Sequence, residues 1–293
     1  MLEMNNVTKT FGSFKALDEL SLHVPKGRIY GLIGPNGAGK TTAIRHMTGV
    51  YRPDSGTVTL EGKPIDENLA VKERICCIAD EPFFFPGASL DEMRSFYAGL
   101  YPQFDNKRFE ELQEVFGLRR KAPIRRFSKG MQKQACFHLA LCTHAEVLIL
   151  DEPVDGLDPV MRRQVWSLLL DDVTRRGTTI LVSSHNLREL EDICDHVGIM
   201  RRGKMLLEKS LADMQGSTVK LQMVGPAPKG LEVLHSSTVG RLSTYIVRGT
   251  LPRVQAAAER EKPPYFDVLP LSLEEIFIYE LGGMAHEAEG FLL

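Results

Sequence analysis

The sequence lacks the features of a secreted or membrane-spanning protein. Its five cysteines are odd in number and show no CxxC spacing, so neither a disulfide framework nor a zinc site is indicated, and a reducing cytosol fits best. No window approaches the roughly 18 continuous apolar residues of a transmembrane helix, and the N-terminal segment MLEMNNVTKTF has no basic patch followed by an apolar stretch. We therefore expect neither a transmembrane helix nor a signal peptide.

A strong net charge is also missing. The 36 Lys and Arg residues nearly balance the 38 Asp and Glu residues, so the formal charge is -2 and gives no global attraction to nucleic acid or anionic membranes. The basic residues between Arg119 and Arg126 are interpreted as a solvated face, and we expect no nucleic-acid partner. With 43% hydrophobic residues over 293 positions, the chain is long enough for one large domain with a smaller appendage.

Apolar runs rich in β-branched residues alternate with longer helical patterns through about residue 210. Several of these runs are apolar throughout, which is typical of strands buried on both faces of a largely parallel sheet. The alternation predicts an α/β fold. The expected strands are Ile29–Ile33, Thr57–Leu60, Ile75–Ala79, Val147–Leu150, Thr178–Ser183 and Val197–Met200, and the expected helices cover 89–101, 105–116, 129–143 and 159–176.

The composition changes after Gln215. Short strand-like pieces, two helix-like stretches and the turn-forming residues 225–230 follow. We expect a larger domain at 1–212 and a small α+β accessory domain at 216–293 without recognisable chemistry of its own. The strand-like pieces are Thr218–Met223, Leu231–His235 and Leu242–Val247, and the helix-like stretches are Leu251–Lys262 and Leu271–Glu280.

Residues Gly34–Thr42 read GPNGAGKTT, directly behind an apolar run and ahead of a helical stretch. In such a phosphate loop, backbone N–H groups of the glycine-rich turn face phosphate oxygens at a helix N-terminus. Lys40 is placed to reach the β and γ phosphates, and the Thr41 hydroxyl to ligate Mg²⁺. The sequence therefore predicts binding of a nucleoside triphosphate. The expected phosphate-binding residues are Gly34, Asn36, Gly37, Ala38, Gly39, Lys40, Thr41 and Thr42.

Paired carboxylates follow a later apolar strand. Val147–Leu150 runs directly into Asp151 and Glu152. Asp151 would hold Mg²⁺, directly or through water, and Glu152 would orient and deprotonate the attacking water. The alternative is an acidic turn after a buried strand, and the presence of the phosphate loop favours the catalytic interpretation.

The segment Phe127–Gln132, FSKGMQ, resembles the LSGGQ signature of the nucleotide-binding subunits of ABC transporters. Ser128 and Gly130 match this signature. Lys129 stands where the family usually has glycine, and Met131 stands where it often has glutamine. In the family this segment grips the γ phosphate of ATP held by the opposite subunit. The alternative is a plain helix N-cap by Ser128.

Three further segments support the resemblance. Val154–Asp158 follows the carboxylates as the family's D-loop does, which implies a nucleotide contact for Asp158. His185 lies 33 residues past Glu152, as the histidine that senses the γ phosphate does. Phe11 occupies the adenine-stacking position, where stacking is worth about 0.5–1.5 kcal/mol, and Phe14 is a nearby competitor.

One position departs from the family pattern. Asp80 stands where the family usually has glutamine. A carboxylate near a triphosphate is repelled unless a cation lies between them, so we expect Asp80 to contact the Mg²⁺ shell; its alternative is a solvent-facing loop residue. Such aspartate-bearing loops resemble those of bacterial ABC-2-type exporter ATPases, and Leu271–Phe277 resembles the end of that group's chains.

Adjacent aromatic residues, Phe83 to Phe85, precede a helical stretch that carries Phe96 and Tyr97. In the family this region docks the membrane subunit. Three adjacent aromatic side chains cannot all face one core, so we expect at least one at a surface or interface. The alternative is a locally buried hydrophobic corner.

The resemblance implies a P-loop NTPase cassette at 1–212, with a mixed, largely parallel sheet and a helical signature subdomain at about 85–142. It further implies binding and hydrolysis of ATP with Mg²⁺. In the family two such chains pair head to tail, and ATP-driven closure of the pair moves membrane subunits that export a substrate. The implied partners are a second nucleotide-binding subunit, identical or different, and integral membrane subunits. The chain would then be cytoplasmic, on the inner face of the membrane.

Two other functions stay open. One is a soluble ABC ATPase that acts on ribosomes or DNA, against which stand the single cassette, the absence of a zinc motif and the lack of a strongly basic surface. The other is a module that closes on ATP but hydrolyses it poorly, a possibility raised by Asp80, Lys129 and Met131.

Overall fold

The computed structural model describes residues 1–272 and 274–275, which belong to two compact units. The boundary between the units lies between residues 208 and 209, and the second unit also includes the short segment 186–195. The first unit is Met1–His185 with His196–Glu208, and the second is Asn186–Asp195 with the described residues from Lys209 onward.

The domain limits expected from the sequence, 1–212 and 216–293, remain predictions beside this division. Residues 273 and 276–280 of the expected helix Leu271–Glu280, and residues 273, 276 and 277 of the family-like tail Leu271–Phe277, lie outside the described residues.

A six-stranded sheet forms the centre of the first unit, in the order β10-β9-β3-β8-β7-β6. The pairs β9/β3, β3/β8, β8/β7 and β7/β6 are parallel, and β3, β7 and β8 are buried along their whole length, which confirms the predicted α/β class. Since these strands run in one direction, the residues that follow them meet at one edge. The strands are β3 (Ile29–Ile33), β6 (Ile75–Ile78), β7 (Val147–Asp151), β8 (Thr179–Ser184), β9 (His196–Arg201) and β10 (Lys204–Ser210).

A second, antiparallel sheet of the first unit has the order β2-β1-β4-β5. It includes the strand expected at Thr57–Leu60. Its two longest strands were not predicted, because shifts in the pairing register between Met4 and Thr10 interrupt the alternation of apolar residues on which strand prediction relies. The strands are β1 (Leu2–Phe11), β2 (Phe14–Val24), β4 (Ser55–Leu60) and β5 (Lys63–Pro64).

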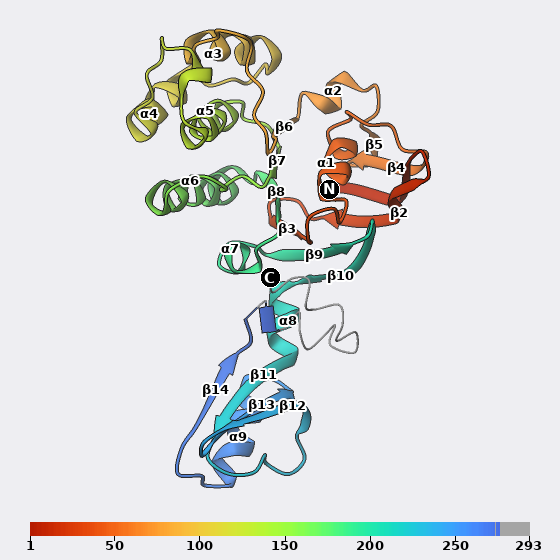
Figure 1. The fold of residues 1–293 in the computed structure, drawn as a ribbon, viewed down its shortest axis with the longest axis vertical. Helices are drawn as coiled ribbons and strands as arrows, with labels where there is room; N and C mark the ends of the chain where they lie inside the picture. Colours follow the sequence, from red (N-terminus) through yellow and green to blue (C-terminus); the bar gives the residue numbers. More distant parts are fainter. Residues whose placement is uncertain (273, 276–293) are drawn as a thin grey trace. The chain divides into compact units, whose positions relative to one another are not determined.

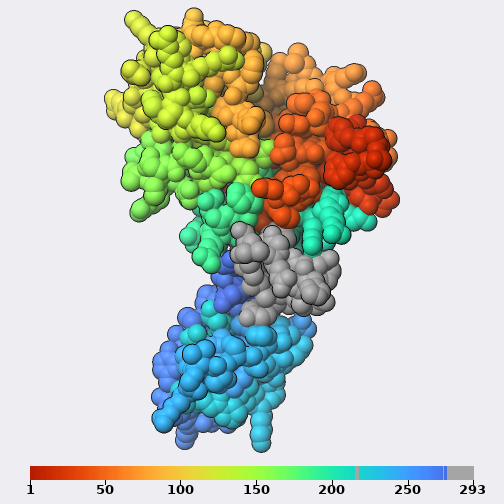
Figure 2. Space-filling view, viewed as in Figure 1, coloured from red at the N-terminus to blue at the C-terminus, as the bar shows by residue number. Residues whose placement is uncertain are grey.

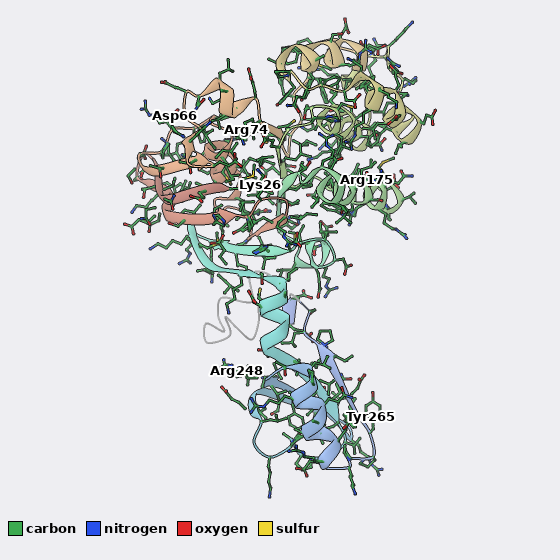
Figure 3. The ribbon with its side chains drawn as sticks, turned by 180° about the vertical axis from the view of Figure 1, so that it is seen from behind. Lys26, Asp66, Arg74, Arg175, Arg248 and Tyr265 are labelled. Carbon is green, nitrogen blue, oxygen red and sulfur yellow. The ribbon has the colours of Figure 1, made fainter. Side chains whose placement is uncertain are left out.

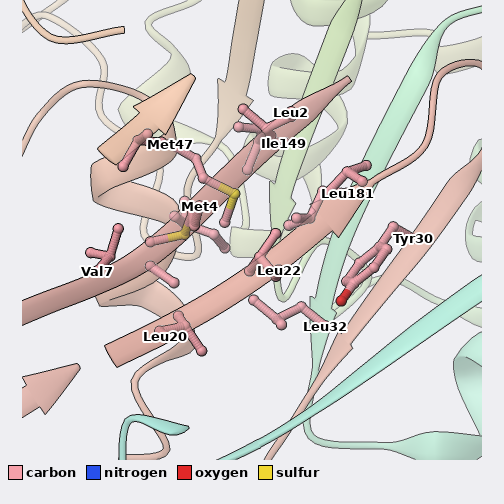
Figure 4. Close-up of a cluster of buried hydrophobic side chains, with 14 of the residues drawn as sticks. Leu2, Met4, Val7, Leu20, Leu22, Tyr30, Leu32, Met47, Ile149 and Leu181 are labelled. Atoms are coloured by element: carbon pink, nitrogen blue, oxygen red, sulfur yellow. The ribbon is translucent and has the colours of Figure 1, made fainter. Parts of the chain in front are cut away.

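One hydrophobic core joins the two sheets of the first unit to the helix α1 (Lys40–Met47) that follows the phosphate loop. Figure 4 shows side chains of both sheets meeting Met47 of that helix. Burial of such a cluster is the main stabilising term for the fold. Its labelled members are Leu2, Met4, Val7, Leu20, Leu22, Tyr30, Leu32, Met47, Ile149 and Leu181.

The helices that connect β6 to β7 lie on the opposite side of the central strands from the antiparallel sheet (Figure 1), and Figure 2 shows them in yellow and green, away from the red N-terminal strands. A capping box between Ser89 and Glu92 begins the first of them. Inside this group the Phe109 ring stacks on the buried His138 ring at a centroid distance of 4.2 Å. The helices of the first unit are α1, α2 (Leu69–Lys72), α3 (Leu90–Leu100), α4 (Asn106–Phe116), η1 (Ile124–Arg126), α5 (Lys129–Cys142) and α6 (Pro159–Arg176).

The starts of β6 and β7 are tied together by charged side chains. Arg74, before β6, donates a 2.7 Å hydrogen bond to Glu146, before β7, and also contacts Glu61. Hydrogen bonds from Arg74 and then from Lys26 lower the pKa of Glu61 to about 2. Figure 3 labels Lys26 and Arg74 on the first unit. This edge is opposite to the one that carries the phosphate loop, because parallel strands place their two ends on opposite edges.

The second unit is built on a four-stranded antiparallel sheet in the order β12-β13-β11-β14. Val219, Leu221 and Val247 from this sheet pack with Val254 and Ala258 of α9. Among the residues that the structure describes, no helix has the length and apolar character that a membrane span requires. The elements are α7 (Leu187–Glu191), α8 (Leu211–Ser217), β11 (Thr218–Met223), β12 (Glu232–Val239), β13 (Leu242–Arg248), α9 (Leu251–Arg260) and β14 (Phe266–Pro270).

A buried ion pair links α4 to α6, and its removal gives a test of how the fold is held. Arg108 Nη2 lies 2.6 Å from Asp172 Oδ1, and Asp172 is buried. Burial raises the pKa of Asp172 and Arg108 opposes this shift. We expect Arg108→Met to lower the free energy of unfolding by about 3 kcal/mol, since it leaves a buried carboxylate without its partner. Chemical denaturation measures the change.

The pH dependence of this loss has a definite sign. A carboxyl whose pKa is higher in the folded state binds protons more readily there, so it lowers stability as the pH rises. The loss caused by Arg108→Met should therefore be smaller at about pH 5 than at about pH 8. Lys107→Met, at an 88% exposed side chain on the same helix, is the control and should change stability little. Equal losses for the two variants would contradict the assignment.

Candidate active site

The phosphate loop joins β3 to α1 at the edge where the parallel strands end. Gly39 has φ 107° at the N-cap of α1, and a Cβ there would lie 2.8 Å from the Ala16 carbonyl oxygen, so glycine is required for both reasons. A cavity of about 290 Å³ opens beside the loop. Its lining residues are Phe14, Ala16, Asn36, Gly37, Ala38, Gly39, Lys40, Thr41, Thr42, Asp80 and Glu152.

Lys40 is the buried cation of this cavity. Its Nζ donates to the carbonyl oxygen of Gly34 at 2.7 Å and lies 3.3 Å from Glu152 Oε1. The side chains of Lys40 and Glu152 are only 6% and 12% exposed. The expected phosphate-binding lysine and the expected base are thus in direct contact, and an entering triphosphate would offer Lys40 another anionic partner.

Glu152 also faces the end of β8. His185 Nδ1 lies 3.0 Å from Glu152 Oε2, so the structure brings together the expected base and the expected γ-phosphate sensor. Asp155, from the segment after Glu152, joins them: one ligand atom of each of the three side chains lies within 4.8 Å of the others. The histidine and the carboxylates come from neighbouring parallel strands, which explains why residues so far apart in sequence meet here.

Asp151 is buried behind Glu152 and is held by a residue that sequence reasoning did not assign to the site. Ser183 Oγ donates to Asp151 Oδ1 at 2.5 Å and accepts from the Glu152 N–H at 3.1 Å. The sequence did contain a signal for Ser183, which is a hydroxyl residue at the end of an otherwise apolar strand, the next strand after the one that ends in Asp151 and Glu152. The Asp151 carboxylate and the Thr41 hydroxyl are hard oxygen donors of the kind that Mg²⁺ takes, so the residues present fit that ion.

Asp80 follows β6 and lines the same cavity with a side chain that is 57% exposed. Its Oδ1 lies 3.7 Å from the Nζ of Lys133, a buried lysine on α5 that sequence reasoning also missed. The Mg²⁺ contact expected of Asp80 remains a prediction.

The signature residues do not line the cavity beside the phosphate loop. Ser128 Oγ accepts from the Met131 N–H at 3.2 Å, which makes it the N-cap of α5 in this chain. A Cβ on Gly130 would lie 2.7 Å from the Gly156 carbonyl oxygen, so the signature packs closely on the segment after Glu152. Asp158 caps α6 by accepting from the N–H groups of residues 160 and 161.

The aromatic residues fall into two groups. Phe11 and Phe14 pair across the turn between β1 and β2, and both are exposed; Phe14 lines the cavity, whereas Phe11 meets Tyr51 edge-on at 5.6 Å. Beyond β6, Phe84 is buried and Phe83 is exposed, as three adjacent aromatic residues predicted.

The chain matches the family described as ABC transporter over residues 17–155. It is 36% identical to the bacitracin transport ATP-binding protein BcrA of Enterococcus faecalis, over 73% of this chain and 70% of that protein. It is 31% identical to the Nod factor export ATP-binding protein I of Cupriavidus metallidurans, over 95% of this chain and 96% of that protein.

Solved structures give the same result for the fold. The ATP-binding subunit of an ABC transporter is similar with a TM-score of 0.68 and 26% identity, over 73% of this chain and 92% of that one. The dimeric bacterial ABC transporter cassette MJ0796 is similar with a TM-score of 0.66 and 20% identity, over 72% of this chain and 99% of that one.

The two aromatic candidates for adenine stacking can be separated by a pair of substitutions. We expect Phe11→Ala to weaken ATP binding by about 0.5–1.5 kcal/mol, or two- to twelvefold in Kd, because a stacked ring is lost. Phe14→Ala is the matched variant at the other exposed ring of the same turn. Titration with a fluorescent ATP analogue measures both. A loss confined to Phe14→Ala would assign the stacking to Phe14, which lines the cavity.

Proposed function

The chain belongs to the family of ABC transporter ATP-binding proteins, and from this premise we propose that it powers a bacterial exporter through ATP-driven closure of a head-to-tail dimer. The observation that carries the proposal is the convergence of Lys40, Glu152 and His185 beside the phosphate loop. By its family the chain is an ABC-type ATPase. The contacts among Lys40, Glu152 and His185 favour a chain that hydrolyses ATP over one that only closes on it.

The residues of the phosphate loop would bind the triphosphate of ATP, with their N–H groups and Lys40 directed at its oxygens. Mg²⁺ would be held by Thr41, Asp151 and Asp80. When bound, the ion would neutralise part of the negative charge on the β and γ phosphates. Phe11 would stack on the adenine. Binding would separate Lys40 from Glu152, because the ammonium then pairs with phosphate, and the carboxylate would be released for chemistry.

Hydrolysis would proceed by in-line attack of water on the γ-phosphorus. Glu152 orients this water and takes its proton as the new P–O bond forms, while the bond from the γ-phosphorus to the bridging oxygen breaks and leaves ADP. His185, in contact with Glu152, would hydrogen-bond the γ-phosphate. Inorganic phosphate carries away the oxygen of the water.

The signature would act in the partner's site. Ser128, Gly130 and Asp158 lie outside the cavity of their own phosphate loop. Pairing two chains head to tail would place the signature of one against the ATP held by the other, with Ser128 and Gly130 as γ-phosphate ligands and Asp158 near the nucleotide. ATP would then favour the closed dimer, because only that state uses both halves of the site.

Export is inferred from the relatives. Two relatives named for bacitracin transport and Nod factor export cover 73% and 95% of this chain. The chain would act with integral membrane subunits, at the cytoplasmic face of the membrane, with exposed Phe83 and its neighbours as the docking region. A soluble ABC ATPase that acts on ribosomes or DNA is not favoured, and co-purification with a membrane protein in place of ribosomes would distinguish the two.

The role of the base predicts the behaviour of one variant. Glu152→Gln keeps the size of the side chain but cannot accept the proton from water, so hydrolysis should slow by about 10²–10⁴ while ATP binding persists. The variant should then accumulate as an ATP-bound dimer in size-exclusion chromatography with Mg²⁺-ATP. Lys40→Ala is the comparison, because it should lose nucleotide affinity and stay monomeric. Hydrolysis at the normal rate by Glu152→Gln would remove Glu152 as the base.

A composite site predicts complementation between two inactive variants. Lys40→Ala lacks the loop lysine and Ser128→Ala lacks the signature hydroxyl, so a mixed dimer has one site with both residues intact. We expect the mixture to hydrolyse ATP faster than either variant alone in steady-state assays.

The matched control places both changes in one chain and mixes it with the unmodified chain. Every site of that mixed dimer lacks one of the two residues, so it should be inactive if sites are shared between chains. Dimers of the unmodified chain alone are active, so both mixed dimers are isolated by a different affinity tag on each chain before the assay. Activity in the isolated control dimer, with none in the isolated complementing dimer, would mean that each chain uses its own signature.

A further inference from the structure

Lys133 is a buried cation that the mechanism above does not use. It lies on α5, five residues after the helix N-cap Ser128, and its side chain is only 5% exposed. Its Nζ donates to the carbonyl oxygen of Glu152 at 3.0 Å and to that of Ala79 at 3.3 Å. The carbonyl oxygen of Asp151 lies at 3.5 Å. One ammonium group thus reaches the ends of both β6 and β7.

Such a burial requires compensation, since removing an ammonium group from water costs several kcal/mol unless it is hydrogen-bonded and paired. The carbonyl oxygens supply the hydrogen bonds. Opposite charge comes from Asp80, whose Oδ1 lies 3.7 Å from the ammonium. The family usually carries an uncharged glutamine at the position of Asp80. A carboxylate at this position supplies the negative charge that the buried Lys133 requires.

The group that Lys133 holds is a strained one. Glu152 has φ +44°, a left-handed conformation that costs a non-glycine residue roughly 1–3 kcal/mol and persists only where its surroundings enforce it. Two hydrogen bonds fix its peptide groups: the Glu152 N–H donates to Ser183 Oγ at 3.1 Å, and its carbonyl oxygen accepts from Lys133. The direction of the Glu152 carboxylate depends on this backbone conformation, because the side chain starts from it.

We propose that Lys133 is a positioning residue for hydrolysis, which holds Glu152 in its left-handed conformation with Asp80 as its counter-charge. The signature helix α5 then has two functions, since Ser128 begins it and Lys133 reaches from it to the base of its own chain. A movement of α5 would pull on Glu152 directly. The inference rests on the proposed role of Glu152 as the base, and it adds a residue that acts through the Glu152 backbone.

The full-length chain provides the test. Lys133→Met keeps a long side chain but removes the donor, and we expect kcat to fall by about tenfold or more while the Kd for ATP changes less than about threefold. The phosphate loop is untouched, so Lys133→Met should also accumulate the ATP-bound dimer. Lys133→Arg should recover part of kcat because a guanidinium group can donate to several carbonyl oxygens. Lys107→Met, the same change at an exposed lysine, is the control and should retain normal kcat.

These outcomes separate positioning from a merely structural role. If Lys133→Met lost kcat, ATP affinity and thermal stability together, or if Lys133→Arg recovered nothing, the positioning role would be wrong. Normal kcat in Lys133→Met would also overturn it, while a defective Glu152→Gln would leave the proposed function intact. Loss of the base role would instead appear as normal hydrolysis by Glu152→Gln.

A double-mutant cycle tests Asp80 as the counter-charge. Asp80→Asn should lower Tm in the unmodified chain, because it leaves the Lys133 ammonium without its carboxylate, and should lower Tm much less in the Lys133→Met background. Equal shifts in both backgrounds would overturn the pairing. Mg²⁺ titration of the same variants records whether Asp80 acts on the metal as well: weaker ATP binding with Mg²⁺, and nearly unchanged binding without it, is the result expected for a metal contact.

Discussion

The contact between the Lys40 ammonium and the Glu152 carboxylate is the interaction around which the candidate active site is organised. Both side chains are nearly buried, and each is delivered by a separate parallel strand: Lys40 after β3 and Glu152 after β7. Only a parallel arrangement puts the two strand ends at one edge. The antiparallel sheet and α1 bury the apolar side chains that keep these strands in register. The geometry of the charges therefore depends on the central core.

Two lysines hold Glu152 from opposite ends. Lys40 meets its carboxylate, and Lys133 meets its carbonyl oxygen from a different helix. Because Glu152 occupies a strained conformation, loss of either contact would let its backbone relax. ATP would compete for Lys40, whereas movement of α5 would act through Lys133. Through these two lysines, both ATP binding and contact with the partner subunit would change the position of the Glu152 carboxylate.

The sequence predicted the parts of the site that are contiguous. Gly34–Thr42 and the Asp151–Glu152 pair are short motifs that directly follow apolar runs, so they could be recognised without the fold, and the apolar runs also predicted the parallel sheet. Lys133 was missed because a lysine within a helical pattern is expected to face solvent. Only the fold buries it and brings its ammonium group to 3.7 Å from the Asp80 carboxylate. Strands β1 and β2 were missed because register shifts disrupt their pattern. The edge-on contact of Phe11 with Tyr51 likewise depends on long-range packing.

The central step of the proposed mechanism is the transfer of Lys40 from Glu152 to the phosphates of ATP. A structure of the full-length chain with Mg²⁺ and a non-hydrolysable ATP analogue tests this step most directly. We predict that Lys40 Nζ leaves Glu152 Oε1 for the β and γ phosphates, and that Ser128 of a second chain faces the γ-phosphate. Glu152 should keep its left-handed backbone and its contact with Lys133. Analogue bound at the loop with Lys40 still on Glu152, and without a second chain's signature, would contradict the proposed mechanism.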